Sequence, residues 1–235
     1  MMIPIVQPAR KHLTLLVALV GMMVTQPLVG HQSRAGGTAS DVVLGAICLY
    51  VLFIVFGKGR QRRAAFALIL PVFASNFGVY ILPSGVQTAS QVAFHCFMVA
   101  FLGFAVAVIL RDIFKKSVIR GDDVIGAFCG YMLLGLVWAN LYTLTYLLFP
   151  GTFAVSQDIA WRLGEWHRRR ALFDYLSFTT LMTLGYGDIA PSGPPAYTLT
   201  WLEAMVGQFY MAVVVAQLVG LRLARALREG GPETK

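Results

Sequence analysis

Six apolar runs, separated by short polar segments, dominate the pattern of the chain. A helix needs about 20 predominantly apolar residues to cross the hydrocarbon core of a bilayer. The pattern therefore predicts an all-α integral membrane protein with six transmembrane helices. The second run is short and must recruit flanking residues or lie in thinned bilayer. The runs are Leu13–Val29, Val42–Phe56, Ala64–Leu82, Val92–Leu110, Val124–Phe149 and Ala196–Leu221.

The first run has a second interpretation, because Arg10 and Lys11 precede it as they would precede the core of a signal peptide. Its apolar core is long for that role, and the nearest site with small residues, Ser33–Ala35, is a weak cleavage site. A retained helix is favoured.

Composition supports a membrane protein and gives it an orientation. The chain has 235 residues, 57% hydrophobic and 13% charged, against about 25% charged in soluble domains. Its net charge of +8 does not indicate nucleic-acid binding, because the basic residues lie in short segments between apolar runs. Most of them lie before the first run, between the second and third, between the fourth and fifth, and after the sixth. The positive-inside rule then places both termini in the cytoplasm and Pro150–Pro195 outside. The compact loops are typical of a bacterial plasma membrane.

The outer segment contains a short apolar stretch that is too short to cross. Ala171–Met182 has 12 residues, enough for a helix of about 18 Å that enters the membrane halfway. TLGYGD (Thr183–Asp188) follows, and Pro191, Pro194 and Pro195 return the chain to the surface. Non-helical backbone at membrane depth is tolerated only where it is enclosed by protein or lines a water-filled path. We predict a re-entrant helix and loop.

The residues of this loop suit a carbonyl-lined path. Gly185 and Gly187 can adopt left-handed dihedral angles without a Cβ penalty, so successive carbonyl groups can turn to one side. TLGYGD also resembles the selectivity-filter signature of potassium channels. The resemblance implies a homotetramer in which four such loops surround an axis and conduct K⁺ passively, with membrane lipid around it and no cofactor. It implies that K⁺ is coordinated by the backbone carbonyls of Thr183, Leu184, Gly185, Tyr186 and Gly187 and by the Thr183 hydroxyl, with Asp188 at the outer mouth.

The residues that would support the filter differ in part from those at the same positions of potassium channels. Leu184 stands where valine or isoleucine is more usual, and Leu176 replaces one of two adjacent aromatic residues, so that Tyr175 alone remains. Glu203 is the only acid inside a crossing run and needs a partner or a proton. Two positions stay open for it: behind the filter, bonded to the pore helix through Thr179 or Thr180, or near the outer headgroups.

The helices around the loop carry further candidates. Gly207 lies 22 residues after Gly185, where the resemblance implies a hinge in the inner helix; close helix packing is the alternative. Gly126 and Gly130 have the spacing that lets two helices approach closely, and Asn140 is expected to make an interhelical hydrogen bond. Helical spacing suggests Met211, Val215 and Val219 as pore-lining residues.

Two regions follow: residues 1–120, a four-helix transmembrane domain with its linker, and residues 121–235, the pore domain. The run Val92–Leu110 contains no arginine, so no charged voltage sensor is predicted. Arg111–Arg120 is expected on the inner membrane surface, the Trp161–Arg170 segment in the outer interface, and the three cysteines buried as free thiols. No motif indicates an enzyme, a soluble substrate or nucleic acid. The alternatives are a weakly selective cation channel, suggested by Leu184, and a secondary transporter, which lacks support from any internal repeat.

Overall fold

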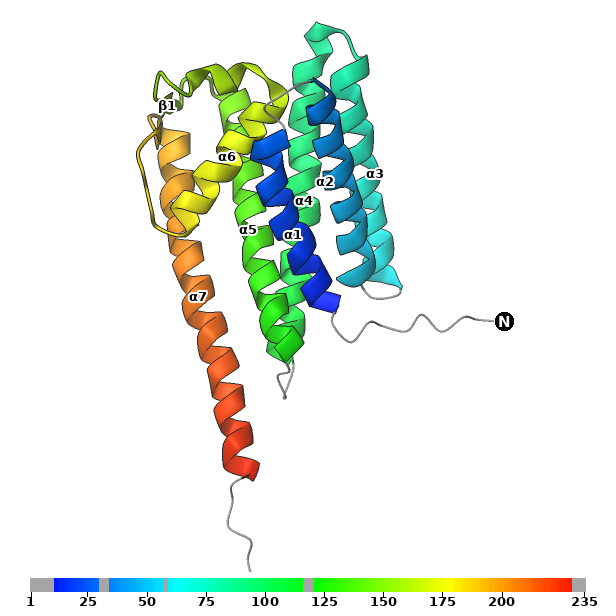
Figure 1. Cartoon of the computed structure of the whole chain (residues 1–235), viewed down its shortest axis with the longest axis vertical. Helices are drawn as coiled ribbons and strands as arrows, with labels where there is room; N and C mark the ends of the chain where they lie inside the picture. Colours follow the sequence, from blue (N-terminus) through cyan, green and yellow to red (C-terminus); the bar gives the residue numbers. More distant parts are fainter. Residues whose placement is uncertain (1–10, 30–33, 57–58, 116–120, 230–235) are drawn as a thin grey trace, which may run out of the picture.

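The structure is a computed structural model that describes residues 11–29, 34–56, 59–115 and 121–229. Within these ranges the chain forms seven α-helices, one short 3₁₀ helix and a two-stranded sheet (Figure 1). The first four helices are α1 (Lys11–Val29), α2 (Arg34–Ile54), α3 (Arg60–Ile81) and α4 (Ser84–Lys115). They are followed by α5 (Gly121–Leu148), β1 (Phe153–Val155), η1 (Ala160–Gly164), α6 (Trp166–Leu181), β2 (Ile189–Pro191) and α7 (Pro194–Glu229).

Four of these helices are long and apolar enough to cross a membrane, which makes the chain a multi-pass membrane protein. They span Arg60–Ile81, Gly85–Lys115, Gly121–Leu148 and Pro194–Gly220. The apolar parts of α1 and α2 for which side chains are described are shorter, His12–Thr25 and Asp41–Phe53. All six predicted runs are helical, but the count of six crossings stays a prediction.

Helix boundaries differ from the predicted runs in two places. α2 begins at Arg34, well before Val42, so the short second run gains polar turns at its start. α6 has 16 residues and begins at Trp166, before the predicted Ala171. Within the predicted interfacial segment, Trp166–Arg170 makes the first turns of α6, and Trp166 and Arg169 are buried in the protein, whereas Trp161 is exposed; its place at the membrane interface stays a prediction.

α5 lies at the centre of the bundle and packs against α1, α4, α6 and α7. Small residues on its surface admit large side chains from three neighbours. A Cβ atom at Gly130 would lie 2.6 Å from the hydroxyl of Tyr210 on α7, and one at Gly135 would lie 2.7 Å from the ring of Phe178 on α6. At Gly126 it would lie 3.1 Å from the ring of His12 on α1. The predicted close helix contact thus occurs between α5 and α7 at Gly130, whereas Gly126 allows the close approach of α1 to α5.

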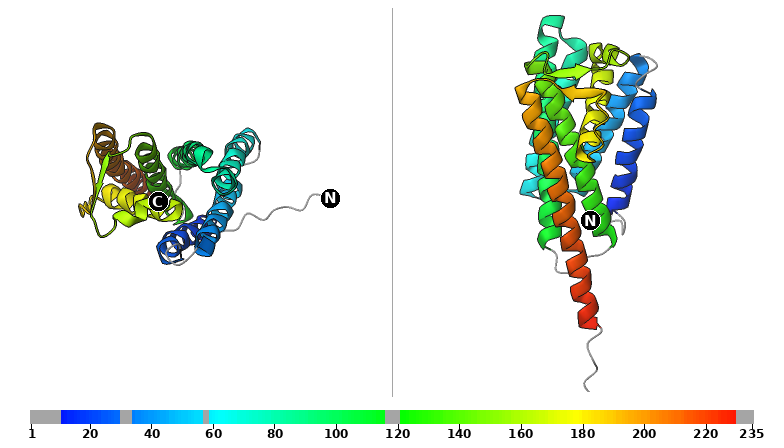
Figure 2. Two further views of the ribbon diagram at one scale, coloured as in Figure 1. Left: turned by 90° about the horizontal axis from the view of Figure 1, so that it is seen from above. Right: turned by 90° about the vertical axis from the view of Figure 1, so that its left-hand side faces the viewer.

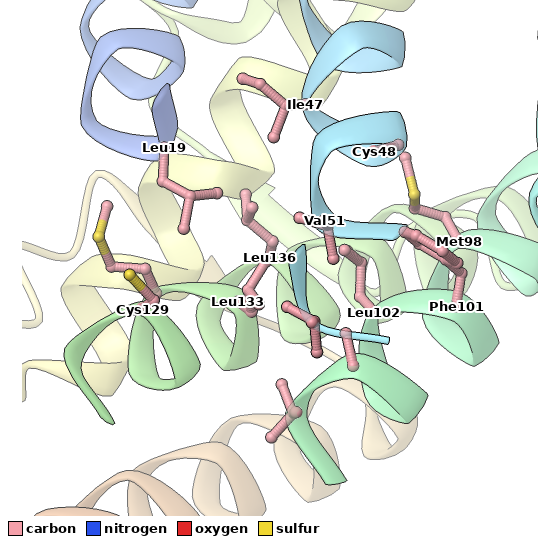
Figure 3. Close-up of a cluster of buried hydrophobic side chains, with 14 of the residues drawn as sticks. Leu19, Ile47, Cys48, Val51, Met98, Phe101, Leu102, Cys129, Leu133 and Leu136 are labelled. Atoms are coloured by element: carbon pink, nitrogen blue, oxygen red, sulfur yellow. The ribbon is translucent and has the colours of Figure 1, made fainter. Parts of the chain in front are cut away.

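Apolar side chains from α1, α2, α4 and α5 point toward one another and join the first four helices to α5 (Figure 3). Cys48 and Cys129 are buried in this cluster as free thiols. Cys96 is exposed, contrary to the prediction, because it lies on the outer side of α4. The expected hydrogen bond of Asn140 is present: its Oδ1 lies 2.7 Å from Nδ1 of the buried His95 on α4.

α6 is inclined to the other helices and ends against the side of α7, from which the chain loops back to the end of the bundle where α6 began (Figure 1). β1 and β2 pair in antiparallel fashion at that end, with Ala154 opposite Ala190. α7 packs against α5, α6 and β2 and extends beyond the other helices at the far end (Figure 2). The predicted surface linker falls partly outside the described residues, since α4 ends at Lys115.

Candidate functional site: a re-entrant pore loop

The loop after α6 has an alternating backbone. Thr183, Gly185 and Gly187 have φ angles of 59°, 56° and 79°, while Leu184 and Tyr186 between them have negative φ. Such alternation turns successive carbonyl groups toward one side of an extended segment. The sequence predicted left-handed conformations at the two glycines. It did not predict one at Thr183, where this conformation costs about 1–2 kcal/mol because the residue has a Cβ atom.

The end of α6 holds the start of this loop. The carbonyl oxygen of Thr179 accepts hydrogen bonds from the amides of Leu184 (2.7 Å) and Gly185 (3.4 Å), and that of Thr180 accepts one from the amide of Thr183 (2.9 Å). The last carbonyl groups of a helix lack partners within it. Here the amide groups of the loop donate to the carbonyl groups of Thr179 and Thr180, and these hydrogen bonds hold the loop against the end of α6.

The outer end of the loop is tied to α6 and to the sheet. The ring of Tyr175 stacks on that of Tyr186 with a centroid distance of 6.3 Å and an interplanar angle of 4°. The phenol of Tyr175 also forms a hydrogen bond with the side chain of Asp188. The carbonyl oxygen of Asp188 accepts bonds from the amide (2.9 Å) and hydroxyl (3.0 Å) of Ser156. Ser156 carried no signal in the sequence.

One chain covers only one side of the loop. Thr183 to Gly187 are exposed, including 68% of Tyr186 and 54% of Leu184. A Cβ atom at Gly185 or Gly187 would meet nothing within 4 Å. Exposed apolar side chains also recur at every fourth residue of α7: Tyr197, Trp201, Met205, Phe209 and Val213.

Glu203 lies behind α6 and is fully buried, so the headgroup position considered for it is wrong. Its Oε1 lies 2.5 Å from the hydroxyl of Ser177 on α6, and its Oε2 accepts a hydrogen bond from the hydroxyl of Tyr142 on α5. Its partners are therefore Ser177 and Tyr142 rather than Thr179 or Thr180. No residue spacing marks this pairing, because the three groups come from separate helices.

Gly207 lies against the end of the pore helix. A Cβ atom there would be 3.0 Å from the carbonyl oxygen of Leu181 and 2.8 Å from its Cδ1. The same carbonyl accepts a hydrogen bond of 3.0 Å from the hydroxyl of Tyr131. α7 is a continuous helix through Gly207, so the structure shows the close packing and the hinge stays a prediction. Met211, Val215 and Val219 are exposed on α7.

The first turns of α6 are held by α2 and α3 through a group that we call the outer network: Asp41, Tyr80, His167 and Arg170. Asp41 Oδ1 pairs with Arg170 Nη1 at 2.8 Å, and its Oδ2 accepts a hydrogen bond of 2.5 Å from Tyr80. The hydroxyl of Tyr80 also lies 2.9 Å from Nε2 of His167. Burial lowers the pKa of His167, although the neighbouring Asp41 opposes this.

Comparison with known proteins agrees with this geometry. Residues 141–221 match the family model described as "Ion channel". A stretch of 91 residues is 35% identical to the "Inward rectifier potassium channel Kirbac3.1" of Paramagnetospirillum magnetotacticum. The pore region of the chain is therefore similar to that of a potassium channel.

The similarity to the potassium channel family is confined to part of each protein. The matched stretch is 38% of this chain and 30% of the relative, so the chain spans less than a third of that channel. No solved structure matches the chain. The matched ion channel domain begins in α5, includes α6 and the loop, and ends in α7.

Proposed function

We propose that the chain is one subunit of a homotetrameric, K⁺-selective channel that conducts K⁺ passively through TLGYGD. The observation that carries the proposal is the alternating backbone of Thr183–Gly187, which follows the short helix α6 and lies between two membrane-length helices, α5 and α7. Carbonyl groups turned to one side can replace the hydration shell of K⁺. The ligands would be the carbonyl oxygens of residues 183–187 and the Thr183 hydroxyl.

Assembly as a tetramer is supported by how little of the ion path one chain provides. Among the described residues, Thr183 to Gly187 are exposed, and so is Tyr175 beside them. Four loops around an axis would enclose the carbonyl groups, and the exposed stripe of α7 from Tyr197 to Val213 would contact the neighbouring subunit or lipid. Four helix C-termini pointing at the axis would each contribute about −0.5 charge to the cavity below.

The proposed topology has six crossings and both termini in the cytoplasm of a bacterial plasma membrane. α1 and α2, with 19 and 21 residues, reach about 28 and 31 Å, close to the thickness of the hydrocarbon core. α6 and the loop would then enter from outside. Tyr175, Thr179, Thr180 and Glu203 would support the filter, with Gly207 as the point where α7 meets the pore helix.

Reversal potentials in planar bilayers test the proposal. The purified protein is placed with K⁺ on one side and Na⁺ on the other, and each tenfold preference for K⁺ moves the reversal potential by about 59 mV. A value well away from zero in the direction of K⁺ permeation is expected. A value near zero would replace the proposal by the weakly selective cation channel that Leu184 suggests, and absence of current would favour a transporter.

Gly185→Ala tests the filter assignment. Alanine disfavours the φ of 56° at this position, so we expect loss of K⁺ current. Gly151→Ala is the matched control, because Gly151 also has positive φ (84°) and open space around its Cα, but lies before β1. Equal effects of both substitutions would mean that backbone strain in general, and not the filter, is responsible.

A further inference from the structure

The carboxyl group of Glu203 joins three helices. Oε1 lies 2.5 Å from Ser177 Oγ of α6, and Oε2 accepts a hydrogen bond from the Tyr142 hydroxyl of α5. Ser177 Oγ also lies 2.7 Å from the carbonyl oxygen of Gly135 on α5. Every atom of this group is enclosed, since Glu203 and Ser177 are both 0% exposed.

The number of protons available to these oxygens bears on whether the carboxyl group of Glu203 is ionised or protonated. The hydroxyl of Ser177 has one proton but lies within hydrogen-bond distance of two oxygens, the Gly135 carbonyl and Glu203 Oε1. The carbonyl can only accept. If Glu203 were ionised, its oxygen could also only accept, and one of the two close oxygen pairs would have no proton between them. If Oε1 carries a proton, Oε1–H donates to Ser177, Ser177 donates to Gly135, and Tyr142 donates to Oε2.

The surroundings agree with this count, because they offer no positive charge. Within the part of the chain that the structure describes, no Lys, Arg or His side chain forms an ion pair with Glu203. The titratable groups that face it are two phenols of α5, Tyr142 and Tyr131. α6 contributes Ser177, and the hydroxyls of Thr180 and Thr200 interact with the phenol of Tyr142. A buried carboxylate without a cation is costly, and such groups take up a proton instead.

We propose that Glu203 is a neutral acid in the assembled channel, and that its proton ties the pore helix to α5 and α7 behind the filter. Glu203 is thus a positioning residue: it holds Ser177, about one turn before α6 ends at Leu181, and it lies one turn from Gly207, where α7 meets Leu181. Its part in holding the filter rests on the proposed function. Its protonation state does not.

The proposal fixes the sign of a pH dependence. The native state binds one proton per subunit that the unfolded state has lost at neutral pH, so stability falls as the pH rises. The folding equilibrium constant should fall by up to about tenfold per pH unit and per subunit. Glutamine is the matched variant: its amide N–H can donate to Ser177 and its oxygen can accept from Tyr142, with no proton to lose.

The experiment measures the thermal stability of the full-length tetramer in detergent between about pH 6 and pH 9, for wild type and Glu203→Gln. Wild type should lose stability as the pH rises, and Glu203→Gln should remove that part of the slope while matching wild type at the acid end. Tyr146→Phe serves as a control for the loss of a phenol elsewhere on α5. Equal slopes in wild type and Glu203→Gln would overturn the proposal.

Infrared spectroscopy decides the case if Glu203→Gln fails to assemble. Wild type should show the C=O band of a protonated carboxyl group at neutral pH, and Tyr142→Phe should shift it, because Oε2 loses its hydrogen-bond donor. Absence of a band that responds to Tyr142→Phe would overturn the proposal. Ion selectivity is read separately, so a tetramer with the predicted slope and no K⁺ selectivity would refute the proposed function alone.

Discussion

The ion pair between Asp41 and Arg170 gives the most direct test of how the first four helices hold the pore helix. The side chains are 6% and 11% exposed, and the pair joins α2 to α6 at 2.8 Å. Removing one partner of a buried ion pair typically costs about 3–5 kcal/mol, because the other charge is left without compensation. Arg170→Gln leaves Asp41 with the hydroxyl of Tyr80, so we expect the lower end, about 3 kcal/mol.

The reverse substitution should cost less. Asp41→Asn leaves the Arg170 guanidinium over the rings of Phe94 and Trp166, at 5.1 and 5.5 Å from their centroids. Cation–π contacts of a desolvated guanidinium offset about 1–2 kcal/mol of the cost of leaving this charge unpaired. We therefore expect the free energy of unfolding to fall by about 2 kcal/mol. The double variant contains no unpaired charge, and its cost should be lower than the sum of the two by about 1–3 kcal/mol.

Thermal unfolding of the purified protein in detergent measures these costs. For a subunit of this size 1 kcal/mol corresponds to about 2–4 °C, so Arg170→Gln should lower the melting temperature by about 6–12 °C. Arg168→Gln is the matched control, since its pair with the 61% exposed Glu165 should contribute less than about 1 kcal/mol. The reasoning is refuted if both arginine substitutions have equal effects, or if the Asp41 and Arg170 costs simply add.

Two further changes test neighbouring contacts. Gly207→Ala should destabilise the protein by about 1–3 kcal/mol, because its Cβ atom would contact the carbonyl oxygen of Leu181. Gly220→Ala is the control: its Cβ atom would meet open space, so the substitution should stabilise α7 by up to about 1 kcal/mol through helix propensity. A change of melting temperature in the same direction for both variants would argue against packing at Gly207. His167 has a lowered pKa from burial and faces Asp41, Glu165 and Arg170, so the native state binds fewer protons than the unfolded state below about pH 6.5. His167 should therefore contribute a loss of stability as the pH drops below this value, opposite in sign to the contribution proposed for Glu203, and His167→Gln should remove it. An unchanged acid slope in that variant would contradict the assignment.

Hydrophobic pattern alone located the helices but not their first turns. The six apolar runs all lie in helices, because burial of apolar side chains in membrane or core does not depend on which neighbour covers them. The start of α6 does depend on its neighbours. Trp166 packs edge-on against Phe94 at 5.4 Å and tilted against His95 at 5.2 Å, and neither contact leaves a mark in the local sequence of α6. The composition of this basic, aromatic segment therefore does not reveal that its second half forms the first turns of α6.

The loop and Glu203 show where prediction from sequence ends. Positive φ at Gly185 and Gly187 follows from the residue type itself, but at Thr183 it is imposed by the end of α6. For Glu203 the sequence required either a partner or a proton. Its partners lie 26 and 61 residues away, on two other helices, so only the folded chain identifies them. Once Ser177 and Tyr142 are in place, a partner and a proton are no longer exclusive alternatives, because Glu203 has both partners and a proton on its carboxyl group would give each close oxygen pair its own hydrogen.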